Sequence, residues 1–207
     1  MTGERELEPR DQLFATLDVT CHLGRLPSNL GCIYIDTVGF LSDIPTPLIA
    51  SFSATLEDAT QADVILHVRD MSHPDTVHQN LQVLQTFDKL DFPLDRTNII
   101  TVGNKIDKVG ADVIRGMKDS AVIPVSCTQN VGLEYLTRTL ESVLVRVTGR
   151  RRLVVRVRTG GPEQEWLQRN STVVSSDVTD DDMNYTNVNV LFNPEELGKF
   201  RAEFIKI

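Results

Sequence analysis

The sequence predicts a doubly wound α/β domain followed by a small α+β domain. Three observations support this prediction: short apolar runs recur along the chain, segments with helical periodicity separate them, and the pattern changes after residue 149. Alternation of strands and helices is typical of a parallel sheet with helices on both faces. The predicted domains are residues 1–149 and 150–207.

The first domain contains four short runs rich in Val, Ile and Leu. Each run is bounded by polar or turn residues, which is the pattern of strands buried on both faces of a parallel sheet. The predicted strands are 32–36, 64–70, 98–104 and 122–126.

Three apolar stripes with helical spacing lie between or after these runs. Before the second stripe, Ser72-His73-Pro74-Asp75 offers a capping oxygen, an early proline and an acid for the first turn. The third stripe stops near Gly149, as expected for a helix end. The predicted helices cover 48–56, 77–87 and 133–147.

The second domain begins with a partly alternating segment that Gly160-Gly161-Pro162 interrupts. We expect Trp166, the only tryptophan, to anchor a core rather than to be an exposed stacking platform. A closing helix is expected to turn Leu197, Phe200 and Phe204 inward. A ferredoxin-like arrangement is compatible with the predicted strands at 153–158, 172–178 and 187–192 and the helices at 163–170 and 194–205.

The composition is that of a soluble globular protein, with 41% hydrophobic and 24% charged residues. No apolar run approaches the roughly 20 residues of a membrane span. The net charge of −8 argues against DNA binding and against general nucleic-acid binding by bulk charge, although it leaves room for a local basic patch.

The first eleven residues are polar and mixed in charge, so we expect no targeting segment in this chain. The three cysteines are odd in number and widely spaced, which suits reduced thiols in a cytosolic or matrix-like compartment. None has a histidine at zinc-ligand spacing.

Asn104-Lys105-Ile106-Asp107 follows a buried-type strand, where open α/β sheets place ligand sites. Asp107 is predicted to accept hydrogen bonds from N1–H and the exocyclic amine of guanine. Adenine lacks this donor pair and would leave a polar group unpaired. Lys105 is expected to lay its methylene stem along the base, and Asn104 to hold the loop together.

Ser126-Cys127-Thr128 follows the next predicted strand and strengthens this interpretation. The backbone amide of Cys127 is predicted to meet the guanine carbonyl oxygen. An ordinary polar strand-to-helix loop is the alternative interpretation of the tetrapeptide.

Asp36-Thr37-Val38-Gly39 also follows a predicted strand. Asp36 is expected to hold Mg²⁺ through a water, and the Gly39 amide to bond the γ-phosphate. The alternative is a turn that merely ends a strand, but the spacing to the later tetrapeptide favours a GTP site. Phe40 stands where several GTPases have the glutamine that orients water, so we assign no catalytic residue and expect slow or partner-assisted hydrolysis.

The chain contains no Gly-rich loop ending in Gly-Lys-Ser/Thr, which normally supplies the phosphate cradle and a magnesium hydroxyl. The predicted fold is therefore an incomplete P-loop-NTPase-like (Ras-like) G domain. We expect the chain by itself to bind GTP weakly or not at all.

Four segments make the chain similar to the HflX family of GTPases, and most similar to its animal, mitochondrial branch. The resemblance implies GTP binding and hydrolysis with Mg²⁺, association with the large ribosomal subunit, and ribosome splitting or recycling. It implies a mitochondrial location, with a cytoplasmic one as the alternative. The segments are 13–18, 36–41, 53–58 and 66–70.

The resemblance also assigns roles that local chemistry does not. Thr16, by itself only a loop threonine, becomes the switch threonine that ligates Mg²⁺ through its hydroxyl. The neighbouring Phe14, Ala15, Leu17 and Asp18 become part of the nucleotide-facing switch.

The family carries an N-terminal RNA-contacting region, a helical linker and a Walker A loop before the stretch that resembles this chain. We therefore expect a fragment, an isoform or an incomplete gene model. Strands 32–36 and 64–70 would lose their shared neighbour and leave two bare edges. The alternative function is a non-catalytic fragment or binding module unable to hold nucleotide alone.

Arginines cluster at the predicted domain junction. They are interpreted either as contacts to ribosomal RNA phosphates or as a solvated helix end, where cations suit the helix dipole. The cluster comprises Arg146, Arg150, Arg151, Arg152, Arg156 and Arg158.

Overall fold

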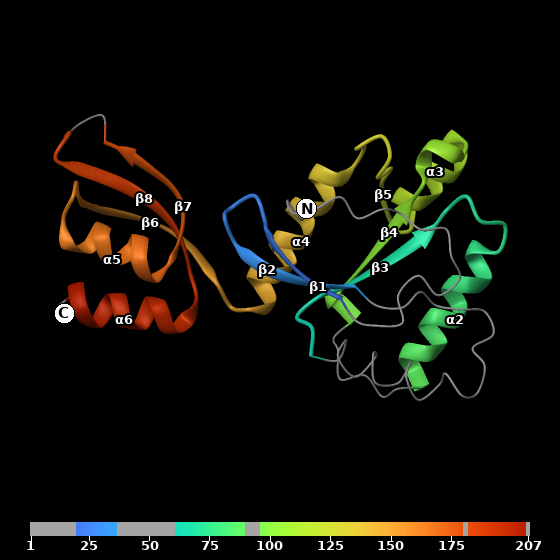
Figure 1. Ribbon diagram of the computed structural model, residues 1–207, viewed down its shortest axis with the longest axis horizontal. Coiled ribbons are helices and arrows are strands. Elements are labelled where there is room, and N and C mark those ends of the chain that lie inside the picture. Colours follow the sequence, from blue (N-terminus) through green and yellow to red (C-terminus); the bar gives the residue numbers. More distant parts are fainter. Residues whose placement is uncertain (1–19, 37–60, 90–95, 180–181, 206–207) are drawn as a thin grey trace. The chain divides into compact units, whose positions relative to one another are not determined.

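A computed structural model describes residues 20–36, 61–89, 96–179 and 182–205 (Figure 1). The chain separates into two compact units, one containing 24–32 and 141–207 and the other containing 2–23 and 33–140. This division falls within a helix and does not decide the predicted boundary at 149/150, which stays a prediction.

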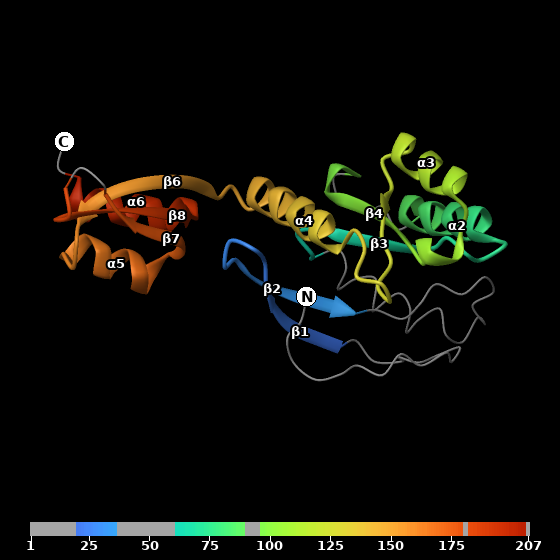
Figure 2. The same cartoon turned by 90° about the horizontal axis from the view of Figure 1, so that it is seen from above.

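Three parallel strands form the sheet of the α/β unit, in the order β3 (Ile65–Asp70), β4 (Ile99–Asn104) and β5 (Ile123–Pro124). Strands β3 and β4 run side by side in both views (Figures 1 and 2). The predicted strands at 64–70 and 98–104 are thus confirmed to within one residue. Strand β5 is shorter than predicted, because the chain turns at Ser126 into a closed loop.

Helices α2 (Thr76–Lys89) and α4 (Leu133–Val147) confirm two predicted helices. Helix α4 ends just before Gly149, whose φ of 64° is a conformation that glycine adopts without strain. The apolar pattern of the sequence does not predict α3 (Ala111–Asp119), in which Met117 is the only buried residue. A single buried residue does not produce an apolar stripe that can be recognised in the sequence. The predicted helix at 48–56 lies outside the described residues.

Strand β2 (Gly31–Asp36) corrects one prediction. It was expected to be buried on both faces of the parallel sheet, but it pairs with β1 (Thr20–Arg25), a strand that the sequence analysis missed. Its exposure alternates, and Ile33 is 64% exposed. In the described residues β2 and β3 belong to different sheets.

The second sheet is antiparallel, with the order β6 (Arg151–Arg158), β8 (Tyr185–Phe192) and β7 (Thr172–Val178). Helices α5 (Pro162–Asn170) and α6 (Pro194–Phe204) lie on one side of it (Figure 1). This is the split β-α-β arrangement of a ferredoxin-like fold. The described residues supply no fourth strand, so the ferredoxin-like prediction holds only for three strands.

The core of this second sheet lies between the strands and the two helices. Val188, Val190 and Phe192 on β8 are fully buried, and Leu197 and Phe200 on α6 pack against them, as predicted. Trp166 lies 5.5 Å from Phe200 between ring centroids and packs on the same core as an anchor. The two short 3-10 helices η2 (Arg96–Asn98) and η3 (Ile106–Lys108) complete the described elements.

The arginine cluster is divided between elements. Arg146 lies in the last turn of α4, whereas Arg151, Arg152, Arg156 and Arg158 belong to β6. A solvated helix end therefore explains Arg146 but not the arginines of the strand. Within the described residues, none of the helices has both the length and the apolar character needed to cross a bilayer.

Candidate functional site

Polar residues gather at the carboxyl edge of the parallel sheet. The register of β3 and β4 sets Asp70 opposite Asn104, because each residue ends an apolar run of similar length. The loop after β4 contains the predicted base motif, and the loop after β5 contains Ser126 to Thr128. Neighbouring parallel strands thus bring together two segments that are 19 or more residues apart.

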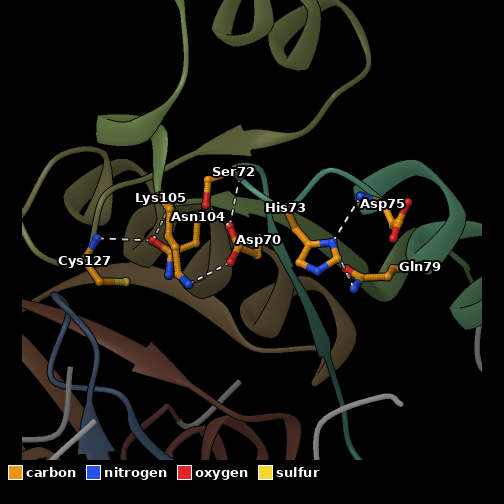
Figure 3. Close-up of polar contacts among 8 residues, drawn as sticks. All are labelled: Asp70, Ser72, His73, Asp75, Gln79, Asn104, Lys105 and Cys127. Atoms are coloured by element: carbon orange, nitrogen blue, oxygen red, sulfur yellow. Dashed lines mark hydrogen bonds and ion pairs between the residues drawn. The ribbon is translucent and has the colours of Figure 1, made fainter. Parts of the chain in front are cut away.

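Asn104 connects the two loops (Figure 3). Its Oδ1 accepts hydrogen bonds from the amide of Lys105 at 2.7 Å and from the amide of Cys127 at 3.3 Å. The carbonyl of Val125 also accepts a bond from the Ile106 amide at 3.2 Å. The side chain of Asn104 is half-buried. It therefore fixes the separation of the loops that the sequence analysis placed around the base.

Lys105 is held in an unusual backbone conformation and by an ion pair. Its φ of 64° lies in the left-handed region, which a non-glycine residue adopts only at a cost. Its Nζ lies 2.7 Å from Oδ2 of Asp70 (Figure 3). The ammonium group is thereby directed toward β3, which sets the course of the methylene stem predicted to lie along a base.

Asp70 belongs to the site although the sequence analysis gave it no role. Burial by itself raises the pKa of its carboxyl, but hydrogen bonds from Lys105 and Ser72 outweigh this effect and lower the pKa to about 2. The Ser72 amide and hydroxyl donate to Oδ1 at 2.9 and 2.7 Å. One feature of the sequence could have revealed this role. Asp70 ends a predicted strand, and that strand neighbours the strand that precedes the base motif.

Asp107 and Ser126 form the contact that defines the outer part of the site. The Ser126 hydroxyl donates to Oδ1 of Asp107 at 2.5 Å. This hydrogen bond is the main cause of a lowered pKa at Asp107, so its carboxylate is ionised at neutral pH. Ser126 is fully buried, whereas Asp107 is exposed. A fixed serine thus orients a carboxylate that faces solvent as a hydrogen-bond acceptor.

The loop around Ser126 is closed by its own backbone. The amides of Ser126 and Val131 donate to each other's carbonyls at 2.9 and 3.0 Å, and the amide of Gln129 donates to the Ser126 hydroxyl at 3.2 Å. Gly132 follows with a φ of 76°, and a Cβ there would lie 2.2 Å from the carbonyl oxygen of Pro124. Only glycine fits this close backbone approach. No motif in the sequence marks Gly132 as a site residue.

The backbone amide of Cys127, which is predicted to meet a guanine carbonyl oxygen, donates to Oδ1 of Asn104 at 3.3 Å. Cys127 and Thr128 are both exposed, and the Thr128 hydroxyl lies 3.1 Å from that of Ser126. A base carbonyl approaching Cys127 would have to share this amide with Asn104.

Several predicted site residues lie outside the described residues. Asp36 is described, and it is exposed at the end of β2. Within the parts of the chain that the structure describes, no group of three or more His, Cys, Asp or Glu residues could hold a metal ion. The residues outside are Phe14, Ala15, Thr16, Leu17, Asp18, Thr37, Val38, Gly39 and Phe40.

The described residues at this edge supply groups suited to recognition. They present an ionised carboxylate, an amide side chain that bridges two loops, and a lysine whose charge is matched by Asp70. The predicted base residues in the loops after β4 and β5 come together. Their role toward a nucleotide stays a prediction.

Comparison with known proteins gives consistent relatives along the whole chain. A human protein named "Putative GTP-binding protein 6" is 43% identical over 205 residues, covering 99% of this chain and 39% of the human one. The "GTPase HflX" of Magnetococcus marinus is 32% identical over 195 residues, covering 93% of this chain and 44% of the relative. The chain thus spans about two fifths of the length of these relatives. No protein-family model matches it.

Among solved structures, a GTP-binding protein from Sulfolobus solfataricus in complex with GDP superposes with a TM-score of 0.52. The sequence identity is 20%, and the match covers 62% of this chain and 45% of the archaeal one. At this identity the likeness concerns the fold. The predicted α/β fold of the P-loop GTPase type is confirmed.

Proposed function

This chain belongs to the HflX-type family of GTP-binding proteins, and on that premise we propose that the loops after β4 and β5 bind the guanine base of GTP. The observation that carries this proposal is the bond between the buried Ser126 hydroxyl and the exposed Asp107 carboxylate. An acceptor oriented in this way matches the two adjacent donors on the Watson–Crick edge of guanine. Adenine offers no such pair, so the arrangement discriminates between the two bases.

Asn104 and Lys105 would support this recognition without touching the phosphates. Asn104 holds the two loops at a fixed distance, so less ordering remains for the moment of binding. Lys105 is restrained by Asp70, and its stem would cover one face of the base. The base site is therefore organised before the nucleotide arrives.

We infer the phosphate and Mg²⁺ side of the site from the family. Thr16 and Asp36 would hold Mg²⁺, the latter through a water, and the Gly39 amide would bond the γ-phosphate. The exposed carboxylate of Asp36 fits this role, since Mg²⁺ usually takes one or two carboxylates and fills its remaining positions with water and phosphate oxygens. A bound Mg²⁺ would neutralise charge on the phosphates.

We extend the proposal to the partner and the location that the family resemblance implies. The protein would act on the large ribosomal subunit in splitting or recycling ribosomes, in mitochondria rather than in the cytoplasm. Cosedimentation with isolated large subunits tests the first part in a chimera that joins this chain to an HflX-type upstream region with a phosphate loop, and GTP is expected to increase the bound fraction over GDP. Equal sedimentation with either nucleotide would contradict a GTP-controlled association. Imaging the tagged natural gene product tests the second part.

The base proposal is tested in a chimera that joins this chain to an HflX-type upstream region containing a phosphate loop. Asp107→Asn should weaken GTP binding by about tenfold or more and strengthen xanthosine triphosphate binding, because the new amide donates where xanthine accepts. Asp112→Asn is the matched control, since Asp112 is exposed on α3 and pairs with the nearby Arg115. Unchanged GTP affinity in Asp107→Asn would refute the base site.

The second candidate function is a binding module that does not hold nucleotide by itself. It is favoured by the absence of a Gly-Lys-Ser/Thr loop from these 207 residues. Titration of the chain with a fluorescent GTP analogue separates the two candidates. Weak or absent binding is expected, and a micromolar, magnesium-dependent affinity would show that this chain binds nucleotide without that loop.

A further inference from the structure

The antiparallel sheet has one face packed against helices and one face without a covering element among the described residues. Along β6 the burial alternates: Leu153, Val155 and Val157 point to the core, and the residues between them are exposed. We call the exposed side the open face. It is formed by Val154, Arg156 and Arg158 of β6, Tyr185, Asn187 and Asn189 of β8, and Ser175 and Asp177 of β7.

We propose that this open face binds single-stranded RNA. The cross-strand register sets Arg156 beside Asn187 and Arg158 beside Tyr185, so that two cations, an aromatic ring and an amide share one small area. Side chains that stack on bases, bond base edges and neutralise phosphates are what single-stranded RNA requires. The proposal does not depend on the nucleotide site.

Two side chains of the open face, Arg156 and Tyr185, already stack on each other. The guanidinium carbon of Arg156 lies 4.9 Å from the centroid of the Tyr185 ring, which is a cation–π contact. Stacking on the ring restrains the planar guanidinium. Both aromatic rings and arginine planes are surfaces on which proteins stack unpaired bases.

The distribution of charged side chains on the open face indicates where the RNA backbone would lie. Arg156 and Arg158 are exposed on an edge strand, two residues apart, which corresponds to about 6.7 Å along a strand. On the opposite strand Asp177 lies beside Asn187 and would repel phosphates. The RNA backbone is therefore expected along β6, with bases directed over β8.

The amides of Asn187 and Asn189 decide between RNA and DNA in this proposal. Both residues lie on the central strand, are half-buried and stand beside the stacking pair. Asn187 offers a donor and an acceptor to base edges or to the 2′-hydroxyl, the group that distinguishes RNA from DNA. Asn189 contributes only its amide nitrogen, because its Oδ1 is buried. Arg152, near the start of the edge strand β6, is instead engaged by Ser28 and Glu141 and is left out of the binding area.

The test measures fluorescence anisotropy of a labelled, unstructured, mixed-sequence 12-nucleotide RNA with the 207-residue chain at low salt. Micromolar binding is expected. The double variant Arg156→Gln/Arg158→Gln should weaken it by about tenfold or more. The salt dependence of log K should fall from a slope of about −1.4 toward zero, since about two phosphate contacts are lost.

The matched control is Arg115→Gln/Arg138→Gln, which removes the same charge from helices α3 and α4. Both control arginines have 71% exposed side chains and pair with acids of their own helices. This control should bind RNA like the unaltered chain. Tyr185→Leu should weaken binding by about fivefold or more, because it removes the stacking ring while keeping the charge. Trp166 fluorescence checks that every variant keeps its core.

Three results of the binding measurements would overturn the proposal. They are no RNA binding by the unaltered chain, an equal loss in the control variant, and equal affinity for duplex RNA or for single-stranded DNA of the same sequence. Equal affinity for these other nucleic acids would mean that the open face binds polyanions in general. Ultraviolet cross-linking that maps to the peptide containing Tyr185 would place the RNA on β8, and cross-links confined to other peptides would contradict it.

Discussion

The two sheets of the molecule carry their exposed polar residues in different places. The parallel sheet β3–β4–β5 carries its polar residues at one edge, in loops that begin where strands end. The antiparallel sheet β6–β8–β7 packs one face against helices and leaves the other available among the described residues. The first arrangement gathers polar groups into one compact site, and the second spreads exposed side chains over the face of a sheet.

The sheets also differ in how fully their apolar surface is buried. Val188 and Phe192 of β8 are fully buried, whereas Val68 of β3 is 58% exposed and Val77 of α2 is 66% exposed. Parallel sheets are normally covered on both faces and paired on both sides of their central strands. Strand β3 pairs only with β4 in the described residues. The antiparallel unit should therefore be the more stable of the two.

The largest effect is expected from Phe192→Ala in the antiparallel core. The side chain is fully buried, so its removal should cost about 3–5 kcal/mol of unfolding free energy. Denaturant unfolding followed by Trp166 fluorescence reports on this core, because the indole packs against Phe200. Leu81→Ala on α2, at a half-exposed position, should leave that transition in place. Equal shifts would show that the two sheets unfold as one.

A second, smaller effect is expected in the loop that follows β5. Gly132→Ala should cost at least about 2 kcal/mol, because left-handed backbone is strained for alanine and its Cβ would collide with the Pro124 carbonyl. Gly160→Ala is the control in the antiparallel unit. Gly160 has a φ of 69°, and none of the described residues places an atom within 4 Å of where its Cβ would lie. Its cost should be about 1 kcal/mol. Similar losses of stability in thermal unfolding would mean that the collision is relieved.

The start of α6 should give an effect of about 1 kcal/mol. Asn193 accepts a bond from the Glu196 amide at 2.8 Å, and the Glu196 side chain accepts one from the Asn193 amide at 2.9 Å. Asn193→Ala removes half of this capping box. Chemical denaturation should show the loss, while Asn170→Ala, at the exposed end of α5, should change stability by less than about 0.5 kcal/mol. A neutral Asn193→Ala would mean that the cap adds nothing to α6.

The smallest effect concerns the ion pair at the parallel edge. Asp70 has a pKa of about 2 in the folded protein and an ordinary value of 3.8, so it favours folding above about pH 4. That contribution is lost as the pH falls from about 4 toward 2. It should stay below about 1 kcal/mol, since both partners are partly exposed.

Lys105→Met should raise the pKa of Asp70 toward its ordinary value and flatten this part of the stability profile. Carboxyl NMR titration measures the pKa directly. A value that stays near 2 in Lys105→Met would assign the lowering to Ser72 rather than to Lys105.

Much of the fold could be predicted from periodicity. Strands β3, β4 and β7 and helices α2, α4 and α6 lie close to their predicted bounds, because strong apolar patterns and turn residues define them locally. Helix α3 escaped prediction because it buries only Met117. Strand β1 escaped it because its one large aliphatic residue, Leu23, is 79% exposed and no apolar run marks the strand, which belongs to a two-stranded sheet.

The sequence by itself determined which residues are expected to face a base and which family the chain resembles, because both depend on residue type at fixed spacing. Tertiary structure determined which contacts hold those residues in place. The pairing of Lys105 with Asp70 and of Cys127 with Asn104 requires the register of neighbouring parallel strands, which no local pattern contains. The same holds for the open face, where Arg156 meets Tyr185 only because β6 and β8 are antiparallel neighbours.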